Sequence, residues 1–364
     1  LGAGCPQTVD VYNISILGMR KVGTRLLNPG RVSAWLPGRA DIWRQHGVWD
    51  LDANGQPVAL KPDYFSVVNG QPISFVENYF KPFANRFARE IREIDPAAII
   101  FIEGVPSQGE LTWDQNDEPN VVHAAHWYDD VTLLLKRFYD VLTIDVHTMK
   151  LVLGRKKVRD LFVRDIREIV EQSDRRMNHA PTLIGETGIP FDMGGKKAYA
   201  NGDFSMQINA LDATMTALER NMVSFTLWNY TPDNSNERGD LWNDEDLSLF
   251  SRDQMTGSGS IDDGGRALEA ALRPYPVATA GEPLHLKFDM KRRVFEYSFR
   301  HTRGVTEPSE FYIPSFQYPH GCRVEVSDGS YEIDLPGQRL VYRHSEAFEF
   351  HTVKILPTDE HSSL

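Results

Sequence analysis

Apolar residues in the first 280 positions alternate between helical spacing and short continuous runs. Apolar side chains at three- and four-residue steps predict amphipathic helices over residues 74–95, 161–170 and 211–222. Continuous apolar runs predict buried strands at residues 97–103, 121–128, 183–186 and 222–230, and a short helix is expected over residues 266–272. This alternation of helices and strands indicates a parallel α/β fold with right-handed connections.

Two segments with a different pattern flank this region. Residues 1–73 are rich in Gly, Pro and aromatic side chains but have no sustained periodicity, so we expect a long loop region packed on a neighbouring part. Beyond about Ala280, short stretches of alternating polar and apolar residues are separated by turn residues such as Asp328-Gly329. This second pattern predicts a small antiparallel β-sandwich. The expected domains are therefore residues 1–280 and 281–364.

Three of the predicted strands end in side chains that can bind or react. These side chains are Glu186 between two glycines, Trp228 with Asn229, and His126 with Trp127 and Tyr128. Each strand end by itself fits an ordinary core strand with a polar tip at least as well as a functional site. Because the carboxyl ends of parallel strands meet at one edge of a sheet, the three together favour a single site. An indole beside an amide suits the apolar faces and hydroxyl edges of a sugar.

Composition and charge restrict the class of partner. The chain has 364 residues and a formal net charge of -12, which disfavours binding to nucleic acid or to an anionic membrane by bulk attraction. Two cysteines at opposite ends of the chain form neither a metal-ligand motif nor a disulfide framework, so a reducing compartment is expected. No apolar run approaches the roughly 18 residues of a membrane-spanning helix. The chain does not begin with methionine, and we expect its natural amino terminus to lie upstream.

The residues at these strand ends resemble glycoside hydrolase family 5, and within it the fungal glucosylceramidases and steryl β-glucosidases related to endoglycoceramidase. The resemblance covers essentially the whole chain. It rests on His126-Trp127-Tyr128, on Ile184-Gly185-Glu186-Thr187-Gly188 and on the long run from Leu227 to Asn243, which is the most specific of the three. The family implies a TIM-type (β/α)₈ barrel and cleavage of β-glycosidic bonds with retention of configuration. The predicted strands then correspond to strands five to eight of a partial barrel, followed by the β-sandwich.

The resemblance also implies roles for single residues. Glu186 matches the nucleophile, His126 and Tyr128 match residues that orient it, and Trp228 matches the platform under the sugar. Substrate binding is further expected from Asn229, Trp127, Asp233 and Asn234. The acidic stretch from Asp233 to Asp246 lacks the central glycine of an EF-hand loop, so a polar rim of the sugar site is favoured over calcium.

One part of the family pattern is missing. The general acid/base of the family is a glutamate after an asparagine at the end of the fourth strand, and no such strand is present in this sequence. Two similar motifs, Asn116-Asp117-Glu118 and Asn236-Glu237, do not follow apolar strands. We therefore expect a chain that lacks the first half of the barrel and has little activity by itself. A catalytically incomplete protein that only binds glycans or glycolipids is the alternative.

The expected partner is a glycolipid or another β-glucoside, and membrane contact would occur only through a lipid substrate. Neither a metal nor an organic cofactor is required. His123 and His126 lie three apart on a strand and are expected to face opposite sides. The tryptophans of the first 73 residues suit either a wall for a lipid aglycone or simple packing, and ceramide, sterol and sugar aglycones remain open. A cytoplasmic or vacuolar location is expected.

Overall fold

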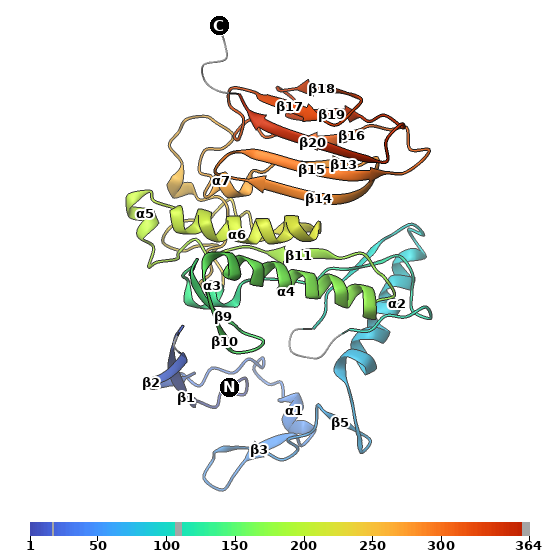
Figure 1. The fold of residues 1–364 in the computed structure, drawn as a ribbon. Coiled ribbons are helices and arrows are strands. Elements are labelled where there is room, and N and C mark those ends of the chain that lie inside the picture. Colours follow the sequence, from blue (N-terminus) through green and yellow to red (C-terminus); the bar gives the residue numbers. More distant parts are fainter. Residues whose placement is uncertain (17, 106–110, 359–364) are drawn as a thin grey trace. The chain divides into compact units, whose positions relative to one another are not determined.

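The computed structural model describes residues 1–16, 18–105 and 111–358 (Figure 1). The chain divides into two compact units. The first contains residues 1–100, 104–121 and 176–178, and the second contains residues 101–103, 122–175 and 179–364. None of the described helices is both long and apolar enough to cross a bilayer.

The first unit contains three antiparallel hairpins instead of the predicted loop region. Their strands are β1 (Gln7–Ser15) with β2 (Gly18–Leu27), β3 (Trp49–Leu51) with β4 (Pro57–Ala59), and β5 (Val67–Val68) with β6 (Gln71–Pro72). The short helix α1 (Ile42–Gln45) precedes β3. Most residues of β1 and β2 are exposed, so these strands lack the alternation of buried and exposed residues that sequence patterns reveal.

The first predicted helix is present, but a different face of it is buried. A π-type turn (η1, Val76–Phe80) leads into α2 (Lys81–Arg92). Ala84 and Ala88 are buried, whereas Phe83 and Phe87 are 61% and 46% exposed. The apolar stripe that predicted this helix is therefore largely exposed within the first unit. The amide of Asn85, beside the buried alanines, donates a 2.9 Å hydrogen bond to the carboxylate of Asp117.

Four strands lie side by side in the order predicted for the α/β region. They are β7 (Ile100–Ile102), β8 (Val121–His123), β11 (Leu183–Thr187) and β12 (Ser224–Leu227). Parallel bridges join β8 to β11, and β11 pairs with β12 in parallel. The other elements of this region are α3 (Asp130–Leu135), the hairpin β9 (Leu142–Asp145) and β10 (Lys150–Leu153), α4 (Arg155–Arg176), α5 (Lys197–Asn201), α6 (Ser205–Asn221), η2 (Arg252–Gln254) and α7 (Leu268–Ala271).

The core of this region lies between the strands and the two long helices. Phe162 and Ile166 of α4, Ile184 of β11, and Leu211 and Leu218 of α6 are all nearly inaccessible to solvent. The helical spacing of these apolar residues is the pattern that predicted both helices. The α/β arrangement therefore follows the sequence expectation in this part of the chain.

The carboxyl-terminal region is a sandwich of two antiparallel four-stranded sheets, as predicted. One sheet has the order β13 (Tyr275–Ala278), β16 (Ser309–Tyr312), β19 (Arg339–Arg343), β18 (Ser330–Asp334). The other has the order β14 (Gly281–Asp289), β15 (Val294–His301), β20 (Phe350–Pro357), β17 (Cys322–Val326). Aromatic residues such as Phe295, Phe299 and Phe311 fill the space between the sheets. The sandwich begins at Tyr275, before the predicted boundary at residue 281.

A buried polar cluster joins the sandwich to the α/β region, and both belong to the second unit. β14 contacts α6 (Figure 1). Arg273 has its Nε 2.8 Å from the carboxyl of Glu219, and its terminal nitrogens lie 3.2 Å from Asp212, another residue of α6. Burial raises the pKa of Glu219 to about 7, although Arg273 and the backbone N–H of Phe288 act in the opposite direction. The two regions are therefore packed as one body.

Candidate active site

A β-bulge in β11 sets the direction of the Glu186 side chain. On β11, residues Ile184 to Thr187 lie opposite Phe225 to Leu227 of β12, so β11 contains one extra residue. The pairing of β11 with β8 shows the same extra residue between the His123–Thr182 and His126–Glu186 bridges. Strict alternation would turn Glu186 to the same side as Ile184, which is buried in the core. The bulge instead lets Glu186 face the polar side chains of β8.

Both oxygens of the Glu186 carboxylate have a partner from the segment after β8. The hydroxyl of Tyr128 donates a 2.5 Å hydrogen bond to Oε1, and Nδ1 of His126 lies 3.0 Å from Oε2. The side chain of Glu186 is 24% exposed, so the carboxylate is recessed yet reachable. Burial, and then the hydrogen bond to Glu186, raise the pKa of Tyr128 well above its ordinary value. Tyr128 therefore stays protonated and remains a donor.

A second carboxylate, Glu103, approaches the same imidazole. Its Oε1 lies 3.2 Å from Nδ1 of His126, so this ring nitrogen stands between Glu103 and Glu186. Sequence reasoning used Glu103 only to mark the end of a strand. The signal was nevertheless present, because an apolar run ending in a carboxylate is also the pattern that identified Glu186.

The two histidines of the β8 segment face opposite sides, as predicted. Nδ1 of His123 lies 2.6 Å from the hydroxyl of Ser173 on α4, and burial lowers the pKa of this histidine. His126 reaches the carboxylates of Glu103 and Glu186 instead. The two imidazoles are therefore held by different groups.

Trp228 lies at the carboxyl end of β12, next to the Glu186 strand. Its backbone N–H donates a 2.8 Å hydrogen bond to the carbonyl of Thr187, and its peptide bond to Asn229 is cis. A Cβ added to Gly188 would lie only 2.2 Å from the Trp228 carbonyl oxygen and 3.8 Å from the Tyr128 ring. Gly188 is therefore required for this close approach. Trp242, an exposed residue that the site prediction omitted, packs edge-on against Trp228 with ring centroids 6.4 Å apart.

The structure corrects two of the predicted substrate-binding residues. Trp127 is 9% exposed and packs edge-on against Phe162 in the hydrophobic core, so its indole is not available to a sugar. Asn234 is fully buried and donates hydrogen bonds to Asp240 and Asp246, at 2.8 and 3.0 Å. The substrate-binding role of both residues was expected with the family resemblance, and the burial of the two side chains argues against it.

The other two predicted substrate-binding residues lie nearer to solvent. Asn229 is half-buried; its side-chain nitrogen lies 3.4 Å from Asp240, and its oxygen accepts a hydrogen bond from the Thr231 hydroxyl. Asp233 is exposed and forms an ion pair with Arg252. The amide of Asn229 is therefore the better placed of the two beside Trp228.

Part of the acidic stretch from Asp233 to Asp246 has an internal structural role. The carboxylate of Asp246 accepts hydrogen bonds from Tyr199, from Asn234 and from the fully buried guanidinium of Arg266. These bonds connect the loop to α5 and to the segment before α7. Within this stretch Asp240 and Asp246 are buried, whereas Asp233, Glu237 and Asp244 are exposed.

The glutamates of the two asparagine–glutamate motifs have partners other than the groups around Glu186. Glu118 belongs to the first unit, where Arg89 and Arg92 each have a nitrogen 3.4 Å from its carboxylate. The carbonyl oxygen of Glu237 accepts a hydrogen bond from Lys196 in an exposed loop. Neither glutamate is among the partners of Glu186, His126 or Tyr128.

The sequence of this chain is similar to those of known glycoside hydrolases. Residues 273–355 match the glycoside hydrolase family 5 C-terminal domain. The chain is 33% identical to a glucosylceramidase of Rhizopus delemar over 355 residues, covering 90% of this chain and 52% of that protein. It is 26% identical to the ergosteryl-beta-glucosidase of Saccharomyces cerevisiae, covering 96% of this chain and 57% of the relative.

The fold also matches the crystal structure of Cryptococcus neoformans sterylglucosidase 1. The TM-score is 0.84 at 27% identity, with 98% of this chain and 58% of that chain covered. The chain thus spans a little over half the length of the proteins it matches. Its similarity to glycosidases extends well beyond the sandwich domain.

Proposed function

We propose that this chain carries the nucleophile of a retaining β-glucosidase that acts on lipid β-glucosides, such as glucosylceramide or steryl glucosides. The observation that carries the proposal is the Glu186 carboxylate, recessed at a strand end and bonded by Tyr128 and His126. The names of the similar proteins, a glucosylceramidase and an ergosteryl-beta-glucosidase, support this substrate class.

In this mechanism Glu186 attacks the anomeric carbon of the glucoside. A bond forms between a carboxylate oxygen and that carbon as the bond to the aglycone oxygen breaks, giving a covalent glycosyl-enzyme. Tyr128 and His126 each contact one carboxylate oxygen and hold the side chain in a single orientation. Trp228 would support the apolar face of the sugar, and Asn229 would bind a hydroxyl.

A retaining mechanism also needs a second carboxyl group, roughly 5–5.5 Å from the first, to protonate the departing oxygen and later to activate water. The carboxylate of Glu103 is linked to that of Glu186 through His126, because both approach the same ring nitrogen. The acid and the nucleophile must flank the scissile bond from different sides, so we assign Glu103 a positioning role through His126. We propose that the acid/base comes from residues outside this sequence, in the first half of a barrel whose strands five to eight are β7, β8, β11 and β12.

The nucleophile can be tested without the acid/base. A 2-deoxy-2-fluoro-β-glucoside with a dinitrophenolate leaving group needs no proton to depart, and its fluorine slows hydrolysis of the glycosyl-enzyme. We expect the chain to be labelled once, on the peptide that contains Glu186, as measured by mass spectrometry. Glu186→Gln should abolish labelling. Glu103→Gln should slow labelling but leave the label on the peptide that contains Glu186. Labelling at another carboxylate would refute the assignment, and sugar binding without labelling would indicate a glycan-binding protein.

A further inference from the structure

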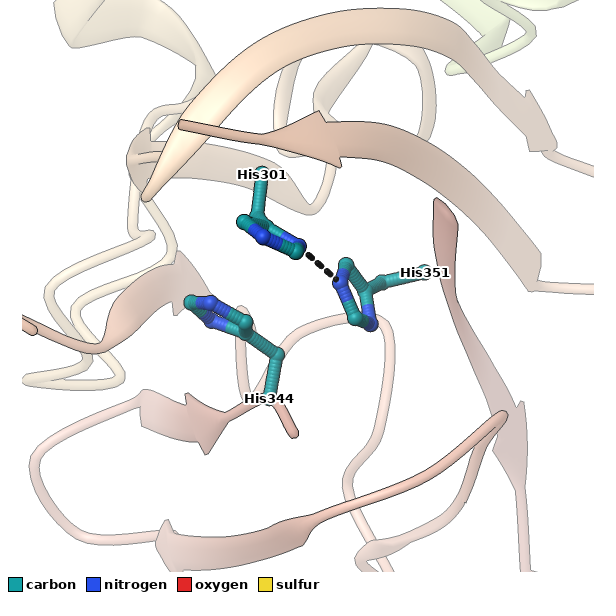
Figure 2. A group of neighbouring side chains, drawn as sticks. All are labelled: His301, His344 and His351. Carbon is teal, nitrogen blue, oxygen red and sulfur yellow. Dashed lines mark hydrogen bonds between the residues drawn. The ribbon is translucent and has the colours of Figure 1, made fainter. Parts of the chain in front are cut away.

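Three histidines from separate strands meet within the sandwich. His301 ends β15, His351 lies in β20 of the same sheet, and His344 directly follows β19 of the opposite sheet. Figure 2 shows the three rings gathered at one place, with a potential ligand nitrogen of each ring within 4.8 Å of the others. The group therefore spans the two sheets.

The orientation of His351 is fixed by a buried carboxylate. His351 is fully buried, and its Nδ1 lies 2.8 Å from Oδ2 of Asp328, whose side chain is 5% exposed. Asp328 is itself held by the backbone N–H of Ser345 and the hydroxyl of Ser327, each at 2.7 Å. Since a carboxylate accepts, Nδ1 of His351 carries the proton and Nε2 presents its lone pair. A carboxylate–histidine pair of this kind commonly orients a metal ligand.

The Nε2 lone pair of His351 points toward the other two rings and accepts a hydrogen bond from Nδ1 of His301, which a bound ion would replace. Its Nε2 lies 3.0 Å from Nδ1 of His301, and the His344 ring lies 4.8 Å from the His351 ring and 5.1 Å from the His301 ring, between centroids. In a tetrahedral zinc site, with Zn–N bonds of about 2.0–2.1 Å, ligand nitrogens are roughly 3.3 Å apart. Small rotations of His301 and His344, both half-buried, would bring the three nitrogens to that spacing.

We propose that His301, His344 and His351 bind one divalent transition-metal ion, with Zn²⁺ the best match, which clamps the two sheets of the sandwich. Imidazole donors suit zinc and its neighbours and not calcium or magnesium, which prefer oxygen. Three protein ligands leave the fourth position of the tetrahedron to water. The site lies in the sandwich, and none of its residues contacts Glu186 or the groups that hold it.

The test uses the whole chain, first stripped of metal with a chelator. Calorimetric titration with ZnCl₂ should give one ion per chain, and CoCl₂ should produce the intense visible absorption of tetrahedral Co²⁺. Asp328→Asn should weaken Zn²⁺ binding by about 10–100-fold, the usual effect of losing an outer carboxylate partner. His344→Gln removes a ligand at the half-buried edge, so it should weaken binding further and abolish the cobalt spectrum. His285→Gln, at an exposed histidine of β14, should change neither.

Circular dichroism of the metal-free variants separates loss of binding from loss of folding. Zn²⁺ should also raise the melting temperature of the unmodified chain and of His285→Gln but not that of His344→Gln. The proposal is overturned if the unmodified chain shows no tetrahedral cobalt spectrum. It is equally overturned if Zn²⁺ binds His344→Gln as tightly as the unmodified chain, because the ion would then lie elsewhere. The cobalt spectrum needs no variant, so the test stands even if His344→Gln does not fold.

Discussion

Replacing Tyr128 with phenylalanine tests how the nucleophile is held. The change removes one hydroxyl and keeps the aromatic ring, so the contacts around Gly188 and Trp228 should persist. The lost interaction is the 2.5 Å hydrogen bond from the tyrosine to Oε1 of Glu186. After the change, Oε1 has no protein donor among the described residues, and His126 alone still reaches the carboxylate.

The expected effect follows from the charge on the acceptor. A hydrogen bond to a charged group contributes about 1.5–3 kcal/mol. With one decade of rate for each 1.36 kcal/mol, Tyr128→Phe should slow labelling of Glu186 by roughly 10- to 150-fold. The bond acts on the carboxylate and not on the sugar. The limiting rate of labelling should therefore fall, while the concentration of glucoside at half-maximal rate should change little.

The assay is the time course of covalent labelling by the activated fluoroglucoside at several concentrations, followed by intact-protein mass spectrometry. Tyr230→Phe is the matched control, because Tyr230 is an exposed tyrosine two residues after Trp228 and its ring contacts the ring of Phe250. Equal limiting rates for Tyr128→Phe and the unmodified chain would refute the idea that this hydroxyl supports the nucleophile. A loss confined to substrate affinity would assign Tyr128 to sugar binding instead.

Three further predictions address packing, pH and the acid/base. Gly188→Ala should cost about 1–3 kcal/mol in denaturant unfolding, because its Cβ would overlap the Trp228 carbonyl; Gly23→Ala, with open space around it, should be silent. Burial raises the pKa of Glu219 to about 7 in the folded chain, above the ordinary value of 4.5, so the folded chain binds this proton more tightly than the unfolded chain. The resulting contribution to the free energy of unfolding is complete below pH 4.5 and is lost as pH rises through 7. The unmodified chain should therefore lose about 3 kcal/mol relative to Glu219→Gln over that range in pH-dependent unfolding, and a gain would contradict this. The chain should turn over glucosylceramide at least about 10²-fold more slowly than a dinitrophenyl glucoside, and comparable rates would show that the acid/base is present.

Sequence patterns predicted the parts of the fold that repeat regularly. The helical spacing in α4 and α6 and the apolar runs of β11 and β12 correspond to real elements, and alternation beyond residue 280 correctly indicated a sandwich. These features are visible because one face of each element is buried over several turns or residues. The hairpin β1–β2 was missed for the opposite reason, since both of its faces are largely exposed.

The details of the site depend on interruptions that periodicity does not reveal. The extra residue in β11 redirects Glu186, and the turn after β8 sends Trp127 into the core while Tyr128 reaches the carboxylate. The histidines of the proposed metal site were not identified from the sequence because they lie in or beside three different strands, and only the arrangement of those strands brings them together. Residue type indicated the chemistry of Glu186, but backbone geometry determines which neighbours act on it.

Every group that orients Glu186 belongs to the second unit. Tyr128, His126 and Glu103 follow β8 and β7, and the bulge that directs the carboxylate lies within β11, supported by the core of α4 and α6. The proposed nucleophile needs an oriented carboxylate, and the contacts to both of its oxygens supply this condition. Proton donation to the leaving group is a separate requirement, met from the other side of the scissile bond. Under the proposed mechanism the two halves of the reaction are separable, so an activated glucoside should report on Glu186 while a lipid glucoside should report on the acid.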